Sequence, residues 1–254
     1  VVEVCVGTGT NLAALLEACA SAGLGLEWWG LELDPAPLQL ALDQPEFRGQ
    51  WQAKALVNLE ELSRRGRWQY PLSSGRMLWG DARRTLPQLL EQRRNQVDLV
   101  WHDAFSPQHC PQLWTVEFLS QLIALLTPEG RWISYCSAAA VRQALVLEGL
   151  TLAALVSQPL RSQQQPTWSG GTIASHQVLD PSTLWRPLSM MEVEHLSCSA
   201  GEPYRDSSGL KNAAAILEQR REAQAAALAR GERGTSSAWR KRWGVKQRQP
   251  EEII

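Results

Sequence analysis

Short apolar segments alternate with helical segments along the first 156 residues, and this alternation constrains the fold more than any other feature of the chain. Strands are predicted at 1–6, 27–33, 76–79, 97–101, 132–136 and 152–156. Helices are predicted between them, at about 12–22, 38–42, 52–65, 83–93, 112–126 and 138–148. Strands that alternate with helices form parallel sheets through right-handed crossovers, which place helices on both faces. The predicted fold is therefore α/β, with a mostly parallel, doubly wound sheet.

The chain after residue 156 has a different composition. Residues 180–209 are rich in turn-forming residues. Alanine, leucine, glutamate, glutamine and arginine dominate 212–230, which favours a helix. We therefore predict a first domain at 1–180 and a C-terminal extension at 181–254 that ends in a basic tail. Because the chain begins inside a predicted strand, an N-terminal portion of the first domain is expected to be missing.

The 254 residues carry a formal net charge of −1, which by itself argues against a protein that binds nucleic acid through charge alone. The charge is, however, unevenly distributed. Residues 205–250 contain 11 Lys and Arg against four Asp and Glu, a net charge of +7, and the remainder has a net charge of −8. The sequence therefore predicts an acidic body with a basic C-terminal segment, which keeps a nucleic-acid partner open.

Apolar runs and cysteine spacing exclude two classes of protein. No stretch approaches 18 uninterrupted apolar residues, so no membrane partner is predicted. The five cysteines form no CxxC pair and no metal-ligand spacing with the four histidines, so no metal site is predicted. An odd, scattered set of cysteines in a chain of this length indicates free thiols in a reducing compartment, which predicts a cytoplasmic location.

The first predicted strand ends in a glycine loop, Gly7-Thr8-Gly9-Thr10-Asn11. In doubly wound sheets ligands bind at the carboxyl ends of the strands, and glycines there allow a tight turn and a close approach of backbone to ligand. The third glycine of the dinucleotide-binding fingerprint is replaced by Leu12, which disfavours a pyrophosphate ligand. The shorter loop fits a nucleoside ligand without phosphate, or is only a tight turn between a strand and a helix.

Acidic residues follow the next predicted strands. Glu32 and Asp34 end the second strand, where a carboxylate accepts hydrogen bonds from ribose hydroxyl groups. Asp81 follows the third strand, where it accepts from an adenine amino group or caps the next helix. Each acid alone fits a loop or capping position, but together with the glycine loop they favour an adenosine site.

The fourth predicted strand leads into His102-Asp103-Ala104-Phe105-Ser106-Pro107, the most informative segment of the chain. It combines a carboxylate, an aromatic ring and a rigid proline turn. Asp103 is placed to hold an amine that attacks an electrophilic methyl group, and residues 108–114 are predicted to form a lid. His102 points away from Asp103 by strand alternation and is predicted to pack in the core.

Read together, three motifs resemble an S-adenosylmethionine-dependent methyltransferase, and they lie at residues 4–11, 79–81 and 102–107. Further similarities lie at residues 110–115, 125–130, 135–138 and 141–142. They resemble the methyltransferase domain of the MnmC family, with its D-G-F-x-P segment, N-P-x-x-W-T helix start, P-G-G turn and T-S-A strand end. The resemblance covers about residues 1–156. Residues 201–206 and 216–221 are similar to the P-Y-R-D and I-x-x-R-R segments of stand-alone members.

The resemblance implies a Rossmann-like class I methyltransferase fold and S-adenosyl-L-methionine as the cofactor. The implied reaction transfers a methyl group to the amine of 5-aminomethyl-2-thiouridine at the wobble position of tRNA, forming 5-methylaminomethyl-2-thiouridine. The cofactor-binding residues that it implies are Gly7, Gly9, Asn11, Glu32 and Asp81. Asp103 is implied to be the catalytic residue beside the substrate amine. The residues implied on the substrate side are Phe105, Ser106 and Trp114.

The chain departs from the family in several places. Ala104 stands where the family has glycine, and Ser106 where it has alanine. Many members carry a glycine- and lysine-rich loop near residues 160–172, whereas residues 162–169 are glutamine-rich here, which weakens the tRNA grip expected there. The flavin-dependent oxidase of two-domain members has no counterpart in length or glycine fingerprint. The resemblance therefore implies a stand-alone form, with separate oxidase or aminomethyl-forming enzymes upstream in the pathway.

Alternative functions from other classes stay open. One is a small-molecule amine N-methyltransferase, and another is a non-catalytic cofactor-binding scaffold that docks tRNA or a partner. A methyltransferase of nucleic-acid base amines is disfavoured because its double proline followed by Tyr or Phe is absent. In the basic tail, Trp239 and Trp243 lie among Lys and Arg residues, which suits phosphate contact and base stacking. A disordered, solubilising tail is the alternative.

Overall fold

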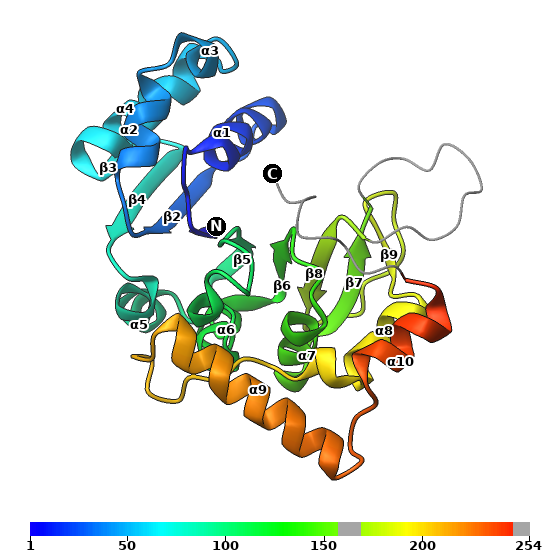
Figure 1. Cartoon of the computed structure of the whole chain (residues 1–254). Coiled ribbons are helices and arrows are strands. Elements are labelled where there is room, and N and C mark those ends of the chain that lie inside the picture. Colours follow the sequence, from blue (N-terminus) through cyan, green and yellow to red (C-terminus); the bar gives the residue numbers. More distant parts are fainter. Residues whose placement is uncertain (157–168, 246–254) are drawn as a thin grey trace. The chain divides into compact units, whose positions relative to one another are not determined.

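The computed structural model describes residues 1–156 and 169–245, which form two compact units (Figure 1). Unit 1 consists of Val1–Phe105, Ser120–Tyr135 and Ser175–Gln177, and unit 2 contains the other described residues. Both units therefore draw on separate stretches of the chain. The predicted domain boundary near residue 180 stays a prediction.

Unit 1 contains a row of strands in the order β3-β4-β2-β1-β5-β6 (Figure 1). Their bounds are β1 Val2–Val4, β2 Leu26–Glu32, β3 Arg67–Tyr70, β4 Ser73–Trp79, β5 Val97–His102 and β6 Leu126–Ser134. Neighbours in this row pair in parallel, except β3 and β4, which are antiparallel. The α/β fold with a mostly parallel sheet, predicted from the alternation of apolar and helical segments, is confirmed.

Helices α1, α2 and α4 bury one face of this sheet in a common hydrophobic core. The helices that alternate with the strands are α1 Thr10–Ala22, α2 Ala36–Leu42, α3 Pro45–Arg48, α4 Ala53–Arg65 and α5 Ala82–Arg93. Trp28 and Trp68 are the largest side chains of this core, and their ring centroids lie 5.6 Å apart. A Cβ atom on Gly30 would collide with the Trp28 ring, and one on Gly75 with the Trp68 ring. Both rings can therefore pack directly against the sheet backbone.

Unit 2 contains strands in the order β8-β7-β9 with helices packed around them. The strands are β7 Thr151–Leu155, β8 Gly171–Ser175, whose last residue is assigned to unit 1, and β9 Trp185–Pro187. The helices are η1 Pro111–Leu113, α7 Ala139–Leu147, α8 Met190–Ser197, η2 Ser199–Gly201, α9 Ala213–Ala229 and α10 Ser236–Trp243. Helix α6 (Val116–Ile123) contributes residues to both units.

A buried charge network holds unit 2 together. Arg142 of α7 is only 2% exposed and forms an ion pair of 3.0 Å with Glu192 of α8, which is 1% exposed. Arg142 Nε also donates to Thr172 Oγ1 of β8 at 2.9 Å. The second carboxylate oxygen of Glu192 pairs with Arg186 of β9 at 2.7 Å. The buried Arg142–Glu192 pair thus connects two helices and two strands.

The segment 180–209 is more ordered than its turn-rich composition predicted, because it contains β9, α8 and η2. Helix α8 begins with a capping box, in which the Ser189 side chain accepts from the Glu192 backbone and the Glu192 side chain accepts from the Ser189 backbone. The helix predicted at about 112–126 ends earlier, at Ile123, and the strand predicted at 132–136 begins earlier, at Leu126. The pairing of β6 with β5 shifts register between Val97 and Leu99, which accommodates residues 127–130 inside the strand.

The C-terminal segment forms helix α10, and this changes the interpretation of its tryptophans. Trp239 is buried, stacks on His195 at 3.9 Å between ring centroids, and donates from Nε1 to the Met191 carbonyl at 3.0 Å. The prediction that Trp239 stacks on RNA bases is therefore wrong. Two of the predicted tail cations, Lys246 and Arg248, lie outside the described residues.

Two further observations concern the cysteines and the apolar segments. All five cysteines are thiols, as their scattered spacing indicated. No helix within residues 1–156 and 169–245 is long and apolar enough to cross a membrane.

Candidate active site

The loop between β1 and α1 is shaped by Gly7 and Gly9, which adopt left-handed φ angles of 57° and 80°. A Cβ atom on Gly9 would lie only 3.0 Å from both Leu38 and Leu59, so tight packing and the left-handed φ together favour glycine there. A Cβ atom on Gly7 would meet no heavy atom within 4 Å. The loop therefore leaves open space in front of Gly7, where a ligand can approach the backbone.

Glu32 at the end of β2 is fixed by backbone donors. Its Oε2 accepts from Gly7 N at 2.9 Å, and its Oε1 accepts from the backbone nitrogens of Leu33 and Asp34 at 2.6 and 3.1 Å. Among the described residues Oε2 accepts one hydrogen bond, so it keeps a lone pair for a ribose hydroxyl group. Asp34 instead accepts from Ala36 N at 2.9 Å at the start of α2, which favours Glu32 of the two candidate acids.

Asn11 and Asp103 meet at the same edge of the sheet. Asn11 is in the first turn of α1, and its Nδ2 donates to Asp103 Oδ2 at 2.9 Å. The Asp103 backbone nitrogen donates to the Val4 carbonyl at 3.0 Å, which continues the pairing of β5 with β1. Within the described part of the chain, Asp103 Oδ1 accepts no hydrogen bond. One carboxylate oxygen is thus held in place, and the other can receive a donor from a substrate.

Glu3 lies beneath this pair, and our sequence interpretation missed it. Its side chain is 1% exposed and accepts from Trp28 Nε1 at 3.1 Å. Burial raises the pKa of Glu3 to about 8, and the nearby carboxylates of Asp103 and Glu32 add to this rise. Hydrogen bonds from Trp28 and Asn11 lower the pKa but do not offset the effect of burial. Glu3 is therefore a neutral acid at pH 7. Its signal in the sequence is a single carboxylic acid inside the apolar strand that precedes the glycine loop.

Asp81 serves as the N-cap of α5. Its side chain accepts from Arg83 N at 3.0 Å and pairs with the Arg83 guanidinium group at 2.7 Å. Burial opposes ionisation, but the hydrogen bonds and charge of Arg83 hold the pKa of Asp81 below its ordinary value. The structure thus shows the capping role, and the adenine contact stays a prediction.

The substrate-side residues divide between the two units. In unit 1 Phe105 is 81% exposed, and Tyr135 Oη donates to the Ala104 carbonyl at 2.7 Å, which ties down the backbone beside Asp103. In unit 2 Ser106 Oγ lies 2.8 Å from His109 Nδ1, and Trp114 is fully buried. The substrate contacts of Phe105, Ser106 and Trp114 stay predictions.

His102 is a core residue, as strand alternation predicted. It is fully buried and meets the Trp132 ring edge-on, with 5.6 Å between ring centroids. Burial lowers the pKa of His102 to about 3, so the imidazole is neutral at physiological pH. His102 therefore does not lie with Asp103 at the polar edge of the sheet.

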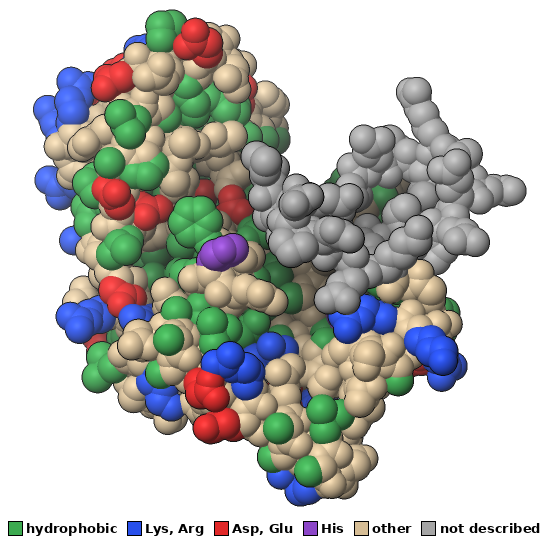
Figure 2. Space-filling view, viewed as in Figure 1, with side chains coloured by type: hydrophobic (Ala, Val, Ile, Leu, Met, Phe, Trp, Pro, Cys, Tyr) green, Lys and Arg blue, Asp and Glu red, His purple; other side chains and the backbone are tan. Residues whose placement is uncertain are grey.

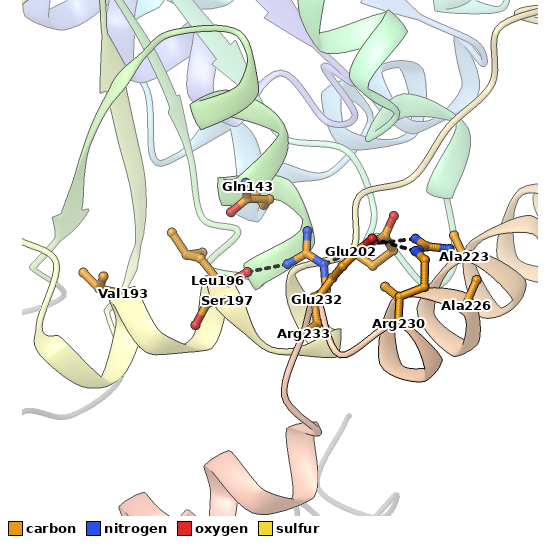
Figure 3. Close-up of a pocket in the computed structure, with 11 residues that line it drawn as sticks. Gln143, Val193, Leu196, Ser197, Glu202, Ala223, Ala226, Arg230, Glu232 and Arg233 are labelled. Atoms are coloured by element: carbon orange, nitrogen blue, oxygen red, sulfur yellow. Dashed lines mark hydrogen bonds and ion pairs between the residues drawn. The ribbon is translucent and has the colours of Figure 1, made fainter.

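A cavity of about 760 Å³ in unit 2 contains none of the predicted site residues (Figure 3). Residues of α7, α8 and α9 and of the segment after α9 line it. Its two arginines are already engaged: Arg230 with Glu232, and Arg233 with Glu202 at 3.0 Å and with the Leu196 carbonyl at 2.8 Å. The convergence of glycine loop, acids and amide in unit 1, rather than this cavity, identifies the candidate active site.

The strand order and the helices of unit 1 are those of a Rossmann-like α/β fold. Residues 52–162 match a family described as S-adenosyl-L-methionine-dependent methyltransferase. The crystal structure of MnmC2 from Aquifex aeolicus superposes with a TM-score of 0.68 at 27% sequence identity, covering 86% of this chain and 65% of that one. The chain is also similar to the curated protein named tRNA 5-methylaminomethyl-2-thiouridine biosynthesis bifunctional protein MnmC. The predicted resemblance to the MnmC family is confirmed.

Two of these curated relatives define the extent of the similarity. The protein from Pseudomonas fluorescens is 32% identical over 160 residues, which cover 58% of this chain and 23% of the relative. That from Chromobacterium violaceum is 31% identical over 154 residues, which cover 56% and 22%. The match thus spans less than a quarter of the length of these relatives.

Proposed function

We propose that the chain transfers a methyl group from S-adenosyl-L-methionine to the amine of 5-aminomethyl-2-thiouridine at the wobble position of tRNA. The product is 5-methylaminomethyl-2-thiouridine, and a separate activity forms the aminomethyl group beforehand. The observation that carries the proposal is the Asn11–Asp103 pair, 2.9 Å apart, at the edge where the glycine loop also ends. The names of the similar MnmC proteins support the choice of tRNA as the substrate.

The residues at this edge fit the parts of S-adenosyl-L-methionine. The open space in front of Gly7 admits a ligand against the backbone, and Glu32 Oε2 retains an acceptor site for a ribose hydroxyl group. Gly9, Asn11 and Asp81 complete the proposed cofactor set. When bound, the cofactor supplies an electrophilic methyl group on a sulfonium centre.

Asp103 is proposed to orient the amine and to accept its proton. An alkylamine has a pKa of about 10, by analogy with lysine, so most of it is protonated at pH 7. A carboxylate next to it favours the ammonium form, so Asp103 does not act by lowering that pKa. Only the neutral amine carries the lone pair that would accept the methyl group, and Asp103 Oδ1 would take up the proton that the nitrogen then loses. Asn11 keeps the carboxylate in position, and positioning supplies much of the rate.

The test is single-turnover methylation of undermethylated tRNA at saturating cofactor, read out by mass analysis of the wobble nucleosides. Wild-type protein should produce the methylaminomethyl nucleoside. Asp103→Asn and Asp103→Ala should slow the reaction about 10²- to 10⁴-fold, the usual range for a lost general base. Asp98→Asn changes an exposed acid on β5, the strand that Asp103 follows, and is the matched control that should react like wild type.

Three outcomes would contradict the proposal. A rate near wild type in both Asp103 variants would exclude the proposed role of Asp103. Methylation of free amines with tRNA left unmodified would instead show a small-molecule methyltransferase. Cofactor binding in calorimetry without any turnover would show a scaffold.

A further inference from the structure

The sheet of unit 1 carries a basic pocket on the face opposite its tryptophan core. Strand register places Trp29 of β2 beside Arg76 of β4, and Arg76 opposite Arg67 of β3. Because side chains alternate along a strand, these three lie on the face away from Trp28 and Trp68. The pocket has a volume of about 520 Å³.

Arg93, the last residue of α5, completes the pocket. Its guanidinium carbon lies 5.4 Å from the centroid of the Trp29 ring, and that of Arg76 lies 5.8 Å from it. Glu27 pairs with Arg93 at 2.6 Å and is the acid among the lining residues. Three guanidinium groups against one carboxylate give the pocket an excess positive charge.

This arrangement favours the binding of an anion. Arg67 and Arg76 are both exposed, face each other across an antiparallel pair, and form no ion pair with any described residue. Like charges directly opposite each other destabilise a sheet. In addition, Trp29 Nε1 and Arg93 Nε are buried donors without a hydrogen-bond partner in the described part of the chain. Charge and unpaired donors therefore point to the same ligand chemistry, an anionic oxygen acceptor.

We propose that a phosphodiester segment of the tRNA substrate binds in the pocket formed by Trp29, Arg67, Arg76 and Arg93. The choice of tRNA as the ligand rests on the proposed function. Figure 2 shows the Lys and Arg side chains of one face in separate small groups rather than in one continuous patch. Trp29 precedes Glu32 by three residues on β2, roughly 10 Å along the strand. An RNA whose wobble base reaches the sheet edge would thus pass close to the pocket.

The test compares Arg67→Ala/Arg76→Ala with wild type, using undermethylated tRNA as the probe. Both residues are exposed, so the variant should fold normally, which thermal unfolding checks. Binding is measured between about 50 and 200 mM KCl, where each lost phosphate contact should lower the slope of log affinity against log salt by about 0.7 to 0.9. Arg64→Ala/Arg65→Ala is the matched control, because these two arginines of α4 are ion-paired with Glu60 and Glu61.

The double variant should lower the salt slope by about 1.5, bind tRNA about tenfold more weakly at low salt, and raise KM for tRNA with little change in kcat. Its affinity for S-adenosyl-L-methionine, measured by calorimetry, should stay within about twofold of wild type. An unchanged slope, or an equal loss in the α4 control, would overturn the phosphate site while leaving the methyltransferase proposal intact. Failure of wild-type protein to methylate tRNA would instead refute the proposed function.

Discussion

Replacing the buried acid Glu3 with glutamine should stabilise the protein at alkaline pH. Glu3 is 1% exposed, and its pKa rises from 4.5 to about 8 on folding because burial disfavours the charged form. The unfolded chain therefore loses this proton from about pH 4.5 upward, while the folded chain keeps it until about pH 8. The stabilising contribution of the neutral acid is complete below pH 4.5 and is lost as pH rises through 8.

The structure also gives the size of this effect. One pH unit of difference between the two pKa values corresponds to about 1.4 kcal/mol, so the shift from 4.5 to about 8 amounts to about 5 kcal/mol above pH 8. Near pH 7 about 3 kcal/mol of this penalty is already present. Glutamine has the same shape, accepts the Trp28 hydrogen bond through its oxygen, and does not ionise. Glu3→Gln should therefore remove the penalty without creating a cavity.

The assay is urea unfolding of wild type and Glu3→Gln, followed by tryptophan fluorescence at about pH 5 and about pH 8.5. The variant should gain several kcal/mol relative to wild type between the two pH values. Glu91→Gln, an exposed acid on α5, should show no such gain. A stability difference between Glu3→Gln and wild type that is the same at both pH values would refute the reasoning, because Glu3 would then ionise as it does in the unfolded chain.

Two further predictions concern unit 2. Burial opposes ionisation of Glu192, but Arg186, Ser189 and Arg142 hold its pKa at about 2. The stabilising contribution of the charged Glu192 is therefore present above pH 4.5 and is lost as pH falls through 2. Glu192→Gln should lower the free energy of unfolding in urea at pH 7 by about 3–5 kcal/mol, and an unchanged midpoint would contradict a structural role for the network. Trp239→Ala should destabilise unit 2 by about 3 kcal/mol because the Trp239 ring is buried against His195. The control Arg240→Ala should leave the melting temperature nearly unchanged, and equal melting temperatures for the two variants would show that α10 is not packed on α8.

The mostly parallel sheet and the polar edge were predictable because they depend on local patterns. Alternation of apolar and helical segments indicated the parallel sheet, and the glycine loop and Asp103 follow strands directly in sequence, so their shared edge follows from topology. The helix predicted at 212–230 is confirmed as α9, whereas the elements within 180–209 were missed for a physical reason. Strand β9 and helices α8 and η2 have three to eight residues each, too few for a periodic pattern, and depend on capping and on the Arg142–Glu192 pair.

Strand register determines which face of the sheet each β2 side chain occupies, and no local sequence pattern could reveal this. Trp28 and Trp29 are adjacent in sequence, yet one packs on Gly30 in the core and donates to Glu3, while the other lies in the basic pocket. A one-residue slip of β2 would exchange these faces, burying the residue that meets Arg76 and exposing the partner of Glu3. The buried acid Glu3 and the proposed phosphate pocket on the opposite face therefore depend on the same register. A mutation that disturbs β2 should affect both, whereas Glu3→Gln and Arg67→Ala/Arg76→Ala each change only one.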